Sequence, residues 1–366
     1  MRIKLFISIL IFIANTVFSQ LYTDRLKLVL DSAISLKTEE EPGFSIHIEK
    51  GNQLLYTHSQ GLANIETKEK FTEFTLSNLG SISKTFIGYS ILILQQQDKL
   101  NIEDSIYKYL PSIKNKELAK KIKIKHLLTH TSGLKDLPSS PTDSLFSLSM
   151  NDEQNFELVK YANKVAFEPG NNFHYSDQAF SALILIIEKV SKTTWQKFIQ
   201  QHIFAQTGMT YSKFTQAKQQ TSGVAHGYRL INGVYSEYDE GECPKMYTAS
   251  NAGVYSNVND LRKYLYGLKY CLFLKCETVQ LSEQILTPVN WYSPNPSPQS
   301  YCWRVNQKDA MDPNSYFEYT GSQGGYRAQL IYFIDKDITI IWQSNNSKNY
   351  SETIINILKK TGLLIK

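Results

Sequence analysis

Apolar and polar residues alternate regularly in two stretches near the beginning of the chain. Residues 44–49 and 53–58 both show this alternation, and a short segment centred on Gly51 between them has the composition of a tight turn. Near the end of the chain, residues 328–334 and 338–343 are apolar runs rich in isoleucine. The pattern predicts a β-hairpin early in the chain and two further strands late in it.

Helix-type spacing of apolar residues predicts helices over 24–36, 81–97, 179–190, 195–204 and near 351–360. From 99 to about 240 the patterns are mostly helical or loop-like, and no internal repeat is visible. Strands at both ends around a helical middle predict an α+β fold. We expect an antiparallel sheet built from N- and C-terminal segments, about 20–98 and 245–366, flanked by helices. A mostly helical insertion would cover about 99–244.

The first nineteen residues have the pattern of a secretory signal. Arg2 and Lys4 precede an apolar run over residues 5–13, and a cleavage position before Gln20 follows. The run is too short to span a bilayer, and no later segment approaches the roughly 18 uninterrupted apolar residues of a spanning helix. We therefore expect an exported chain, periplasmic or secreted, whose folded part covers residues 20–366.

The charge of the chain is close to balanced. The formal net charge is +5, and removal of the two basic residues of the leader lowers it to +3. The charges are spread without long blocks, so nothing in the sequence indicates a nucleic-acid partner.

Four cysteines, Cys243, Cys271, Cys276 and Cys302, lie in the second half of the chain. In an exported protein they can form disulfides. Cys271 and Cys276 are near enough to close a small loop, but spacing does not determine the pairing. Since no two cysteines form a C-x-x-C pair, we expect no structural metal site from them. The sequence does not determine the oligomeric state.

Ser81 and Lys84 lie three residues apart at the start of a strongly apolar helix pattern. If the helix begins near Ser81, the two side chains share one face and their tips can meet. The helix N-terminus favours negative charge on the serine oxygen, and a desolvated lysine can accept the serine proton. The pair is a candidate nucleophile and base. The alternative is that Ser81 only caps the helix while Lys84 extends its ammonium to solvent.

Two later segments supply further candidate site residues. Tyr175 and Asp177 alternate in an extended loop before an apolar helix, so both side chains can point the same way. Tyr319, Thr320 and Gly321 lead into the late strand, in a glycine-rich segment that lets backbone N–H groups approach a ligand closely.

In this order, the three segments resemble the motifs of the serine β-lactamase and penicillin-binding-protein superfamily. The similarity is to the branch of β-lactamase-related hydrolases with class C β-lactamases, D-alanyl-D-alanine carboxypeptidases and several esterases. Further matches are residues 125–134, 187–191 and 252–256, so the resemblance spans nearly the whole chain after the leader.

The resemblance implies acyl transfer to a serine followed by hydrolysis. Ser81 would be the acylated nucleophile, Lys84 its proton acceptor or electrostatic partner, and Tyr175 the general base or its partner. The N–H groups of Ser81 and Ser322 would form the oxyanion hole. The substrate-binding positions would be Asp177, Tyr319, Thr320 and Gly321. The substrate would be a peptidoglycan-type peptide, a β-lactam or a small ester, and no cofactor or metal is implied.

Two positions depart from the family's pattern. Asp177 stands where the second motif often ends in asparagine, and a carboxylate there would anchor Lys84 as an ammonium and leave more of the proton transfer to Tyr175. Tyr319 stands where the third motif commonly has lysine or histidine, so a partner for a substrate carboxylate is lost unless Arg327 replaces it. This lowers the expectation of efficient β-lactamase activity. The alternative is a receptor or sensor module with impaired turnover.

Histidines and aromatic residues offer rival interpretations. His126 and His130 lie four apart, a spacing that suits a zinc pair, but no H-E-x-x-H motif is present. We therefore favour a structural role for this segment, and a hydrogen-bonded structural role for His174. Tyr301 and Trp303 fit either the rim of a pocket or ordinary packing.

Overall fold

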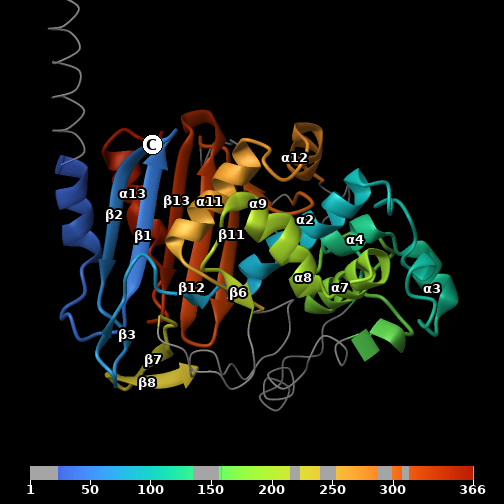
Figure 1. Cartoon of the computed structure of the whole chain (residues 1–366), viewed down its shortest axis with the longest axis horizontal. Coiled ribbons are helices and arrows are strands. Elements are labelled where there is room, and N and C mark those ends of the chain that lie inside the picture. Colours follow the sequence, from blue (N-terminus) through green and yellow to red (C-terminus); the bar gives the residue numbers. More distant parts are fainter. Residues whose placement is uncertain are drawn as a thin grey trace, which may run out of the picture.

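A six-stranded antiparallel sheet forms the centre of the structure, which is a computed structural model (Figure 1). The structure describes residues 24–134, 156–157, 159–214, 223–239, 253–286, 299–306 and 313–365. The strand order is β10-β11-β12-β13-β1-β2. The strands are β1 (Phe44–Lys50), β2 (Gln53–Gln60), β10 (Arg304–Asn306), β11 (Tyr316–Gln323), β12 (Tyr326–Phe333) and β13 (Ile338–Ser344). The predicted hairpin and both late strands are confirmed.

The N- and C-terminal segments meet inside this sheet, as predicted. β1 pairs with β13, with Ile46 opposite Trp342 and Ile48 opposite Ile340. Gly51, in the β1–β2 turn, has a φ of +61°, a conformation that glycine adopts without steric cost. The α+β fold class read from the sequence is therefore confirmed.

Both faces of the sheet are covered by helices. Residues 24–34 and α13 (Ser351–Lys360) pack on one face, and α11 (Val258–Lys269) packs on the other (Figure 1). Ile340 packs in the core beneath residues 24–34 and α13, and Ile341 packs in the core beneath α11, because successive side chains of a strand point to opposite faces. Burying each such side chain contributes about 1.5–3 kcal/mol.

A largely helical part lies beside the sheet and packs around the buried helix α2 (Figure 1). Its helices are η1 (Gly80–Ile82), α2 (Ser83–Gln96), η2 (Ile106–Lys108), α3 (Lys116–Lys121), α4 (Ile124–Leu128), α7 (Asp177–Ser191), α8 (Trp195–Ile199), the π-helix η3 (Gln200–Phe204) and α9 (Ala205–Thr207). No helix in the described part of the chain has both the length and the apolar character needed to cross a bilayer.

Short strands interrupt the stretch predicted to be mostly helical. β6 (Lys213–Phe214) joins β5 (Ser77–Asn78) and β9 (Val254–Ser256) in a small sheet, and β7 (Gly227–Ile231) pairs with β8 (Val234–Asp239). A further pair is formed by β3 (Leu62–Asn64) and β4 (Glu69–Lys70). The β7–β8 hairpin is a correction to the sequence prediction. Its signal was present, since Asn232 and Gly233 with positive φ form the type of turn that closes hairpins.

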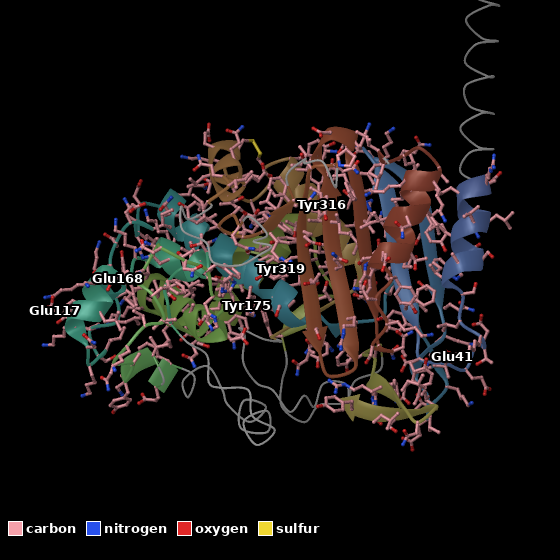
Figure 2. The ribbon with its side chains drawn as sticks, turned by 180° about the vertical axis from the view of Figure 1, so that it is seen from behind. Glu41, Glu117, Glu168, Tyr175, Tyr316 and Tyr319 are labelled. Atoms are coloured by element: carbon pink, nitrogen blue, oxygen red, sulfur yellow. A yellow bond between two sulfur atoms is a disulfide. The ribbon has the colours of Figure 1, made fainter. Side chains whose placement is uncertain are left out.

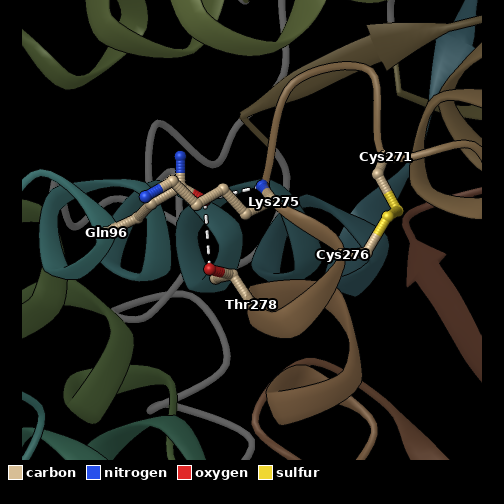
Figure 3. The surroundings of a disulfide bond; sticks show 5 residues. All are labelled: Gln96, Cys271, Lys275, Cys276 and Thr278. Carbon is tan, nitrogen blue, oxygen red and sulfur yellow. Dashed lines mark hydrogen bonds between the residues drawn. A yellow bond between two sulfur atoms is a disulfide. The ribbon is translucent and has the colours of Figure 1, made fainter.

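A disulfide joins Cys271 and Cys276 in the segment that leads into α12 (Cys276–Ser282) (Figure 3). Beside it, Gln96 at the end of α2 accepts hydrogen bonds from the Lys275 N–H and the Thr278 hydroxyl, so α12 is tied to α2. Cys302 is buried and not disulfide-bonded. Cys243 and the predicted leader lie outside the described residues.

Candidate active site

Ser81 lies in the short helical turn η1, directly before the buried helix α2. The segment in front of it is held by the small sheet, because the Leu79 N–H donates to the Val254 carbonyl at 3.0 Å. The Gly80 N–H donates to Asn78 Oδ1 at 2.8 Å. Ser81 itself is partly exposed, so its hydroxyl is presented at the mouth of α2, as the sequence pattern predicts.

The structure brings Ser81, Lys84 and Tyr175 together. The Tyr175 hydroxyl donates to Ser81 Oγ at 2.8 Å, across 94 positions of sequence. Lys84 Nζ donates to the same oxygen at 3.3 Å. Tyr175 and Tyr319 appear next to each other at the junction between the sheet and the helical part (Figure 2). The three predicted catalytic side chains therefore meet at one oxygen atom.

Lys84 is buried and forms an ion pair with Asp177. Its Nζ lies 2.7 Å from Asp177 Oδ1, the lysine side chain is fully buried, and the aspartate side chain is 31% exposed. The ammonium also lies 4.9 Å from the centre of the Tyr175 ring. A buried charge requires a charged or hydrogen-bonding partner, and Asp177 supplies one. The expected contact between Asp177 and Lys84 is present.

The start of α7 places Tyr175 and Asp177. Ser176 caps this helix, with its side chain accepting from the Ala179 N–H at 3.2 Å. Asp177 is the first residue of the helix, and Tyr175 lies in the extended segment before the cap. One local motif thus fixes two site residues, because the cap residue between them has an extended conformation.

β11 approaches η1 so closely that no side chain fits between the two backbones. A Cβ atom on Gly321 would lie 1.8 Å from the Leu79 carbonyl oxygen. A Cβ on Gly80, which has a φ of +52°, would lie 2.6 Å from the Ser322 nitrogen. The backbones around Ser81 and Ser322 are therefore adjacent, which is the arrangement that a pair of N–H donors requires.

Alternation along β11 separates the other predicted residues of this segment. Tyr319 and Gly321 lie on the strand face that meets η1, whereas Thr320 and Ser322 lie on the opposite face. Thr320 is half-buried opposite Gln329. Its role in lining the substrate channel remains a prediction.

Tyr319 puts a buried phenol near the ion pair. Its side chain is 6% exposed, and burial raises its pKa well above 10, to which the neighbouring Tyr175 adds. Tyr319 is therefore neutral at physiological pH. Arg327 lies on β12 opposite Ser322, and its guanidinium donates to the Gly324 carbonyl at 3.2 Å and to the Tyr326 carbonyl at 2.6 Å.

His130 is a contact residue of the site that the sequence did not reveal as such. From the sequence it is a member of a histidine pair with His126, whereas in the structure its ring stacks on Tyr175 at 4.4 Å. His126 contacts the Lys123 N–H instead. Among the described residues, no group of three or more histidine, cysteine, aspartate or glutamate side chains is arranged to hold a metal ion. The stacking could not be read from the sequence, since the two residues are far apart along the chain.

The remaining aromatic and histidine candidates are placed by packing. Tyr301 and Trp303 are buried in the core, and the Trp303 Nε1–H donates to the Tyr89 hydroxyl at 2.7 Å. His174 is exposed, and its N–H donates to the His130 carbonyl at 2.9 Å. Both rings are packed in the core, and each also lines a pocket, Trp303 beside Leu330 and Tyr301 beside His126, so the structure supports both interpretations.

Comparison with known proteins identifies relatives that are similar in sequence. The chain is 26% identical over 320 residues to penicillin-binding protein 4* of Bacillus subtilis (strain 168), covering 84% of this chain and 69% of that protein. It is 31% identical over 192 residues to protein flp of Staphylococcus aureus (strain COL), covering 52% of this chain and 38% of that protein.

Solved structures share the fold at low sequence identity. The octameric penicillin-binding protein homologue from Pyrococcus abyssi superposes with a TM-score of 0.76 at 24% identity, over 88% of this chain and 74% of that one. D-amino acid amidase from Ochrobactrum anthropi SV3, with D-phenylalanine bound, superposes with a TM-score of 0.76 at 16% identity, over 93% of this chain and 98% of that one. The family model described as Beta-lactamase matches residues 30–359. The chain therefore belongs to the Beta-lactamase family, which confirms the superfamily predicted from its sequence.

Proposed function

We propose that the protein is a serine hydrolase that cleaves an amide or ester through an acyl-enzyme on Ser81. The observation that carries the proposal is the convergence of the Tyr175 hydroxyl, at 2.8 Å, and the Lys84 ammonium, at 3.3 Å, on Ser81 Oγ. A serine hydroxyl becomes a useful nucleophile when a neighbouring group can take its proton.

In the proposed reaction, Tyr175 first loses its proton to solvent, and Ser81 Oγ then attacks the acyl carbon while the serine proton passes to the resulting phenolate. The Lys84 ammonium, held by Asp177, stabilises negative charge on the phenol oxygen that accepts this proton. The backbone N–H groups of Ser81 and Ser322 would stabilise the oxyanion, each contributing a few kcal/mol. The bond to the leaving group then breaks, and the leaving group takes the proton from Tyr175. Water gives a proton to the same phenolate as it attacks the ester carbon, the bond to Ser81 Oγ breaks, and the proton returns from Tyr175 to the serine oxygen.

The neutral Tyr319 favours substrates that lack a carboxylate beside the reacting carbonyl. A β-lactam and a peptide ending in D-alanine both carry such a carboxylate, which a cation in this position would bind. The buried phenol carries no charge to offer. We therefore rank small esters and uncharged amides above both β-lactams and peptidoglycan-derived peptides that end in a free carboxylate.

Export belongs to the proposal as well. The predicted leader lies outside the described residues, and the support comes from the bond between Cys271 and Cys276. Disulfides persist mainly in oxidising compartments such as the periplasm or the cell exterior. Fractionation of cells followed by N-terminal sequencing of the purified protein would test it, and a cytoplasmic protein that begins at Met1 would contradict it.

Intact-mass spectrometry with a fluorophosphonate and with a fluorescent penicillin tests the central proposal. An adduct on wild-type protein that is absent from Ser81→Ala is the expected result with at least one probe. An acyl adduct that forms and then clears indicates an enzyme, whereas one that persists indicates the alternative, a receptor or sensor. No adduct with either probe would overturn the assignment of Ser81. A chromogenic ester, a D-Ala-D-Ala peptide and a cephalosporin, compared by kcat/KM, then test the substrate ranking.

A further inference from the structure

The buried His130 ring packs against Tyr175, the proposed base. Its side chain is 3% exposed, and its ring stacks on the Tyr175 ring with the centroids 4.4 Å apart and the planes inclined by 26°. Phe180 of α7 packs on the same imidazole at 5.0 Å. The phenol of Tyr175 therefore has a flat ring on one side that restricts where it can swing.

His130 also holds the backbone on both sides of Tyr175. Its carbonyl accepts from the His174 N–H at 2.9 Å, and its Nδ1 accepts from the Ser176 N–H at 3.1 Å. The peptide groups before and after Tyr175 are thus fixed by one residue, while the ring of that residue contacts the tyrosine ring. Three contacts made by His130, two hydrogen bonds and one ring contact, therefore constrain the orientation of the Tyr175 phenol.

The contacts require a neutral imidazole. Nδ1 can accept a hydrogen bond only when it carries no proton. Burial lowers the pKa of His130 well below 6.5, and the charges of Lys84 and His174 lower it further. His130 also has a φ of +56°, a left-handed conformation in which asparagine and histidine are enriched among residues with side chains.

We propose that His130 is the positioning residue for Tyr175, holding its hydroxyl on Ser81 Oγ. This rests on the proposed function, in which Tyr175 takes the serine proton, and adds a residue that acts only through it. Misplacing a reacting group by about 1 Å can reduce a rate about a hundredfold. Loss of His130 should therefore slow acylation without weakening the initial binding of the substrate.

His130→Asn is the main test variant, because asparagine tolerates the left-handed backbone and keeps a side-chain acceptor near Nδ1 while removing the stacked ring. We expect the rate constant for acylation of Ser81 to fall about 10- to 100-fold, with the concentration for half-maximal rate unchanged. His126→Asn is the matched control, since the His126 ring accepts from the Lys123 N–H. It should acylate at the wild-type rate. His130→Phe keeps a ring but loses the acceptor, and should give a smaller loss.

A double-mutant cycle with Tyr175→Phe separates positioning from a general structural role. If His130 acts only through the Tyr175 hydroxyl, His130→Asn should change the residual rate of the Tyr175→Phe protein less than about threefold. Equal fold losses in both backgrounds would overturn the proposal. If His130→Asn does not fold, as judged by circular dichroism, the same cycle with His130→Phe decides between these two outcomes.

The outcome for the wild-type protein distinguishes the two proposals. If wild-type protein forms no Ser81 adduct, the proposed function fails and this inference fails with it. If wild-type protein is acylated and both His130 variants react at its rate, only the positioning role is refuted.

Discussion

The two sides of the site are built in different ways. On the sheet side, η1 and β11 contribute backbone, and Gly80 and Gly321 allow the two segments to touch. On the helical side, α7 and the segment after α4 contribute side chains, and an ion pair, a helix cap and a buried imidazole hold them. The sheet side therefore depends on two glycines that have no side chain, whereas the helical side depends on hydrogen-bonding and charged partners.

This difference predicts different responses to substitution. Backbone contact at the sheet side leaves no space for relaxation, because main-chain atoms of a packed sheet cannot rotate away. Side chains on the helical side can adjust to a lost partner, and their charges respond to pH. Changes at the sheet side should therefore have the larger effects, and changes at the helical side should alter pH dependence.

The largest effect is expected for Gly321→Ala. The added methyl group would meet the Leu79 carbonyl oxygen at 1.8 Å, so η1 and β11 must separate. We expect a loss in unfolding free energy of about 3 kcal/mol or more and a fall in Ser81 acylation of at least about a hundredfold, measured by urea unfolding and intact mass. Gly362→Ala is the control for backbone strain without a clash, since Gly362 has a φ of +80° but nothing lies within 4 Å of its Cβ position; it should cost about 1–2 kcal/mol of unfolding free energy and leave acylation of Ser81 unchanged. Normal acylation by Gly321→Ala would contradict the close approach.

Asp177→Asn should change the pH dependence of the site. Without the carboxylate, one negative charge fewer opposes ionisation of the Tyr175 phenol, so the rising limb of the acylation rate should move to lower pH. The measurement is the pH–rate profile of acylation. Asp337→Asn is the matched control, because the exposed Asp337 pairs with Lys269 through a 2.6 Å contact outside the site. An unmoved profile in Asp177→Asn would refute the coupling.

Acid should destabilise the protein through two buried histidines on the helical side. Burial lowers the pKa of His126 to about 4 and that of His130 well below 6.5. As pH falls below about 6.5 the unfolded chain binds protons that the folded chain does not, so the unfolding free energy falls. For His130 the slope approaches about 1.4 kcal/mol per pH unit. Urea unfolding across this range should show a shallower slope in His130→Asn; parallel slopes would contradict the prediction.

The smallest effect is expected for the disulfide near α12. The bond closes a loop of only five positions, so removing it should lower the unfolding free energy by about 2 kcal/mol at most. Cys271→Ser combined with Cys276→Ser should therefore unfold at lower urea concentration but acylate Ser81 at the wild-type rate. A lost adduct would show that the tie between α12 and α2 reaches the site.

Most of the fold could be predicted from the sequence because its signals are local. The hairpin β1–β2, the strands β12 and β13, and the helix α13 each follow from the spacing of apolar residues within a short window. The β7–β8 hairpin was missed although its Asn-Gly turn is also a local signal, because the surrounding stretch reads as helical and loop-like. Its exposed Leu230, Ile231 and Val234 weaken the alternation by which a strand is recognised.

The sequence by itself determined the elements, the family and the three segments that carry Ser81, Tyr175 and Tyr319. Only the tertiary structure decided that the Tyr175 hydroxyl meets Ser81 Oγ, that Asp177 pairs with Lys84, and that His130 stacks on Tyr175. The physical reason is the distance along the chain over which each kind of interaction acts. Propensity, periodicity and turn chemistry act over a few residues, whereas these contacts join side chains 45 to 94 positions apart and exist only once the sheet and the helical part have packed together.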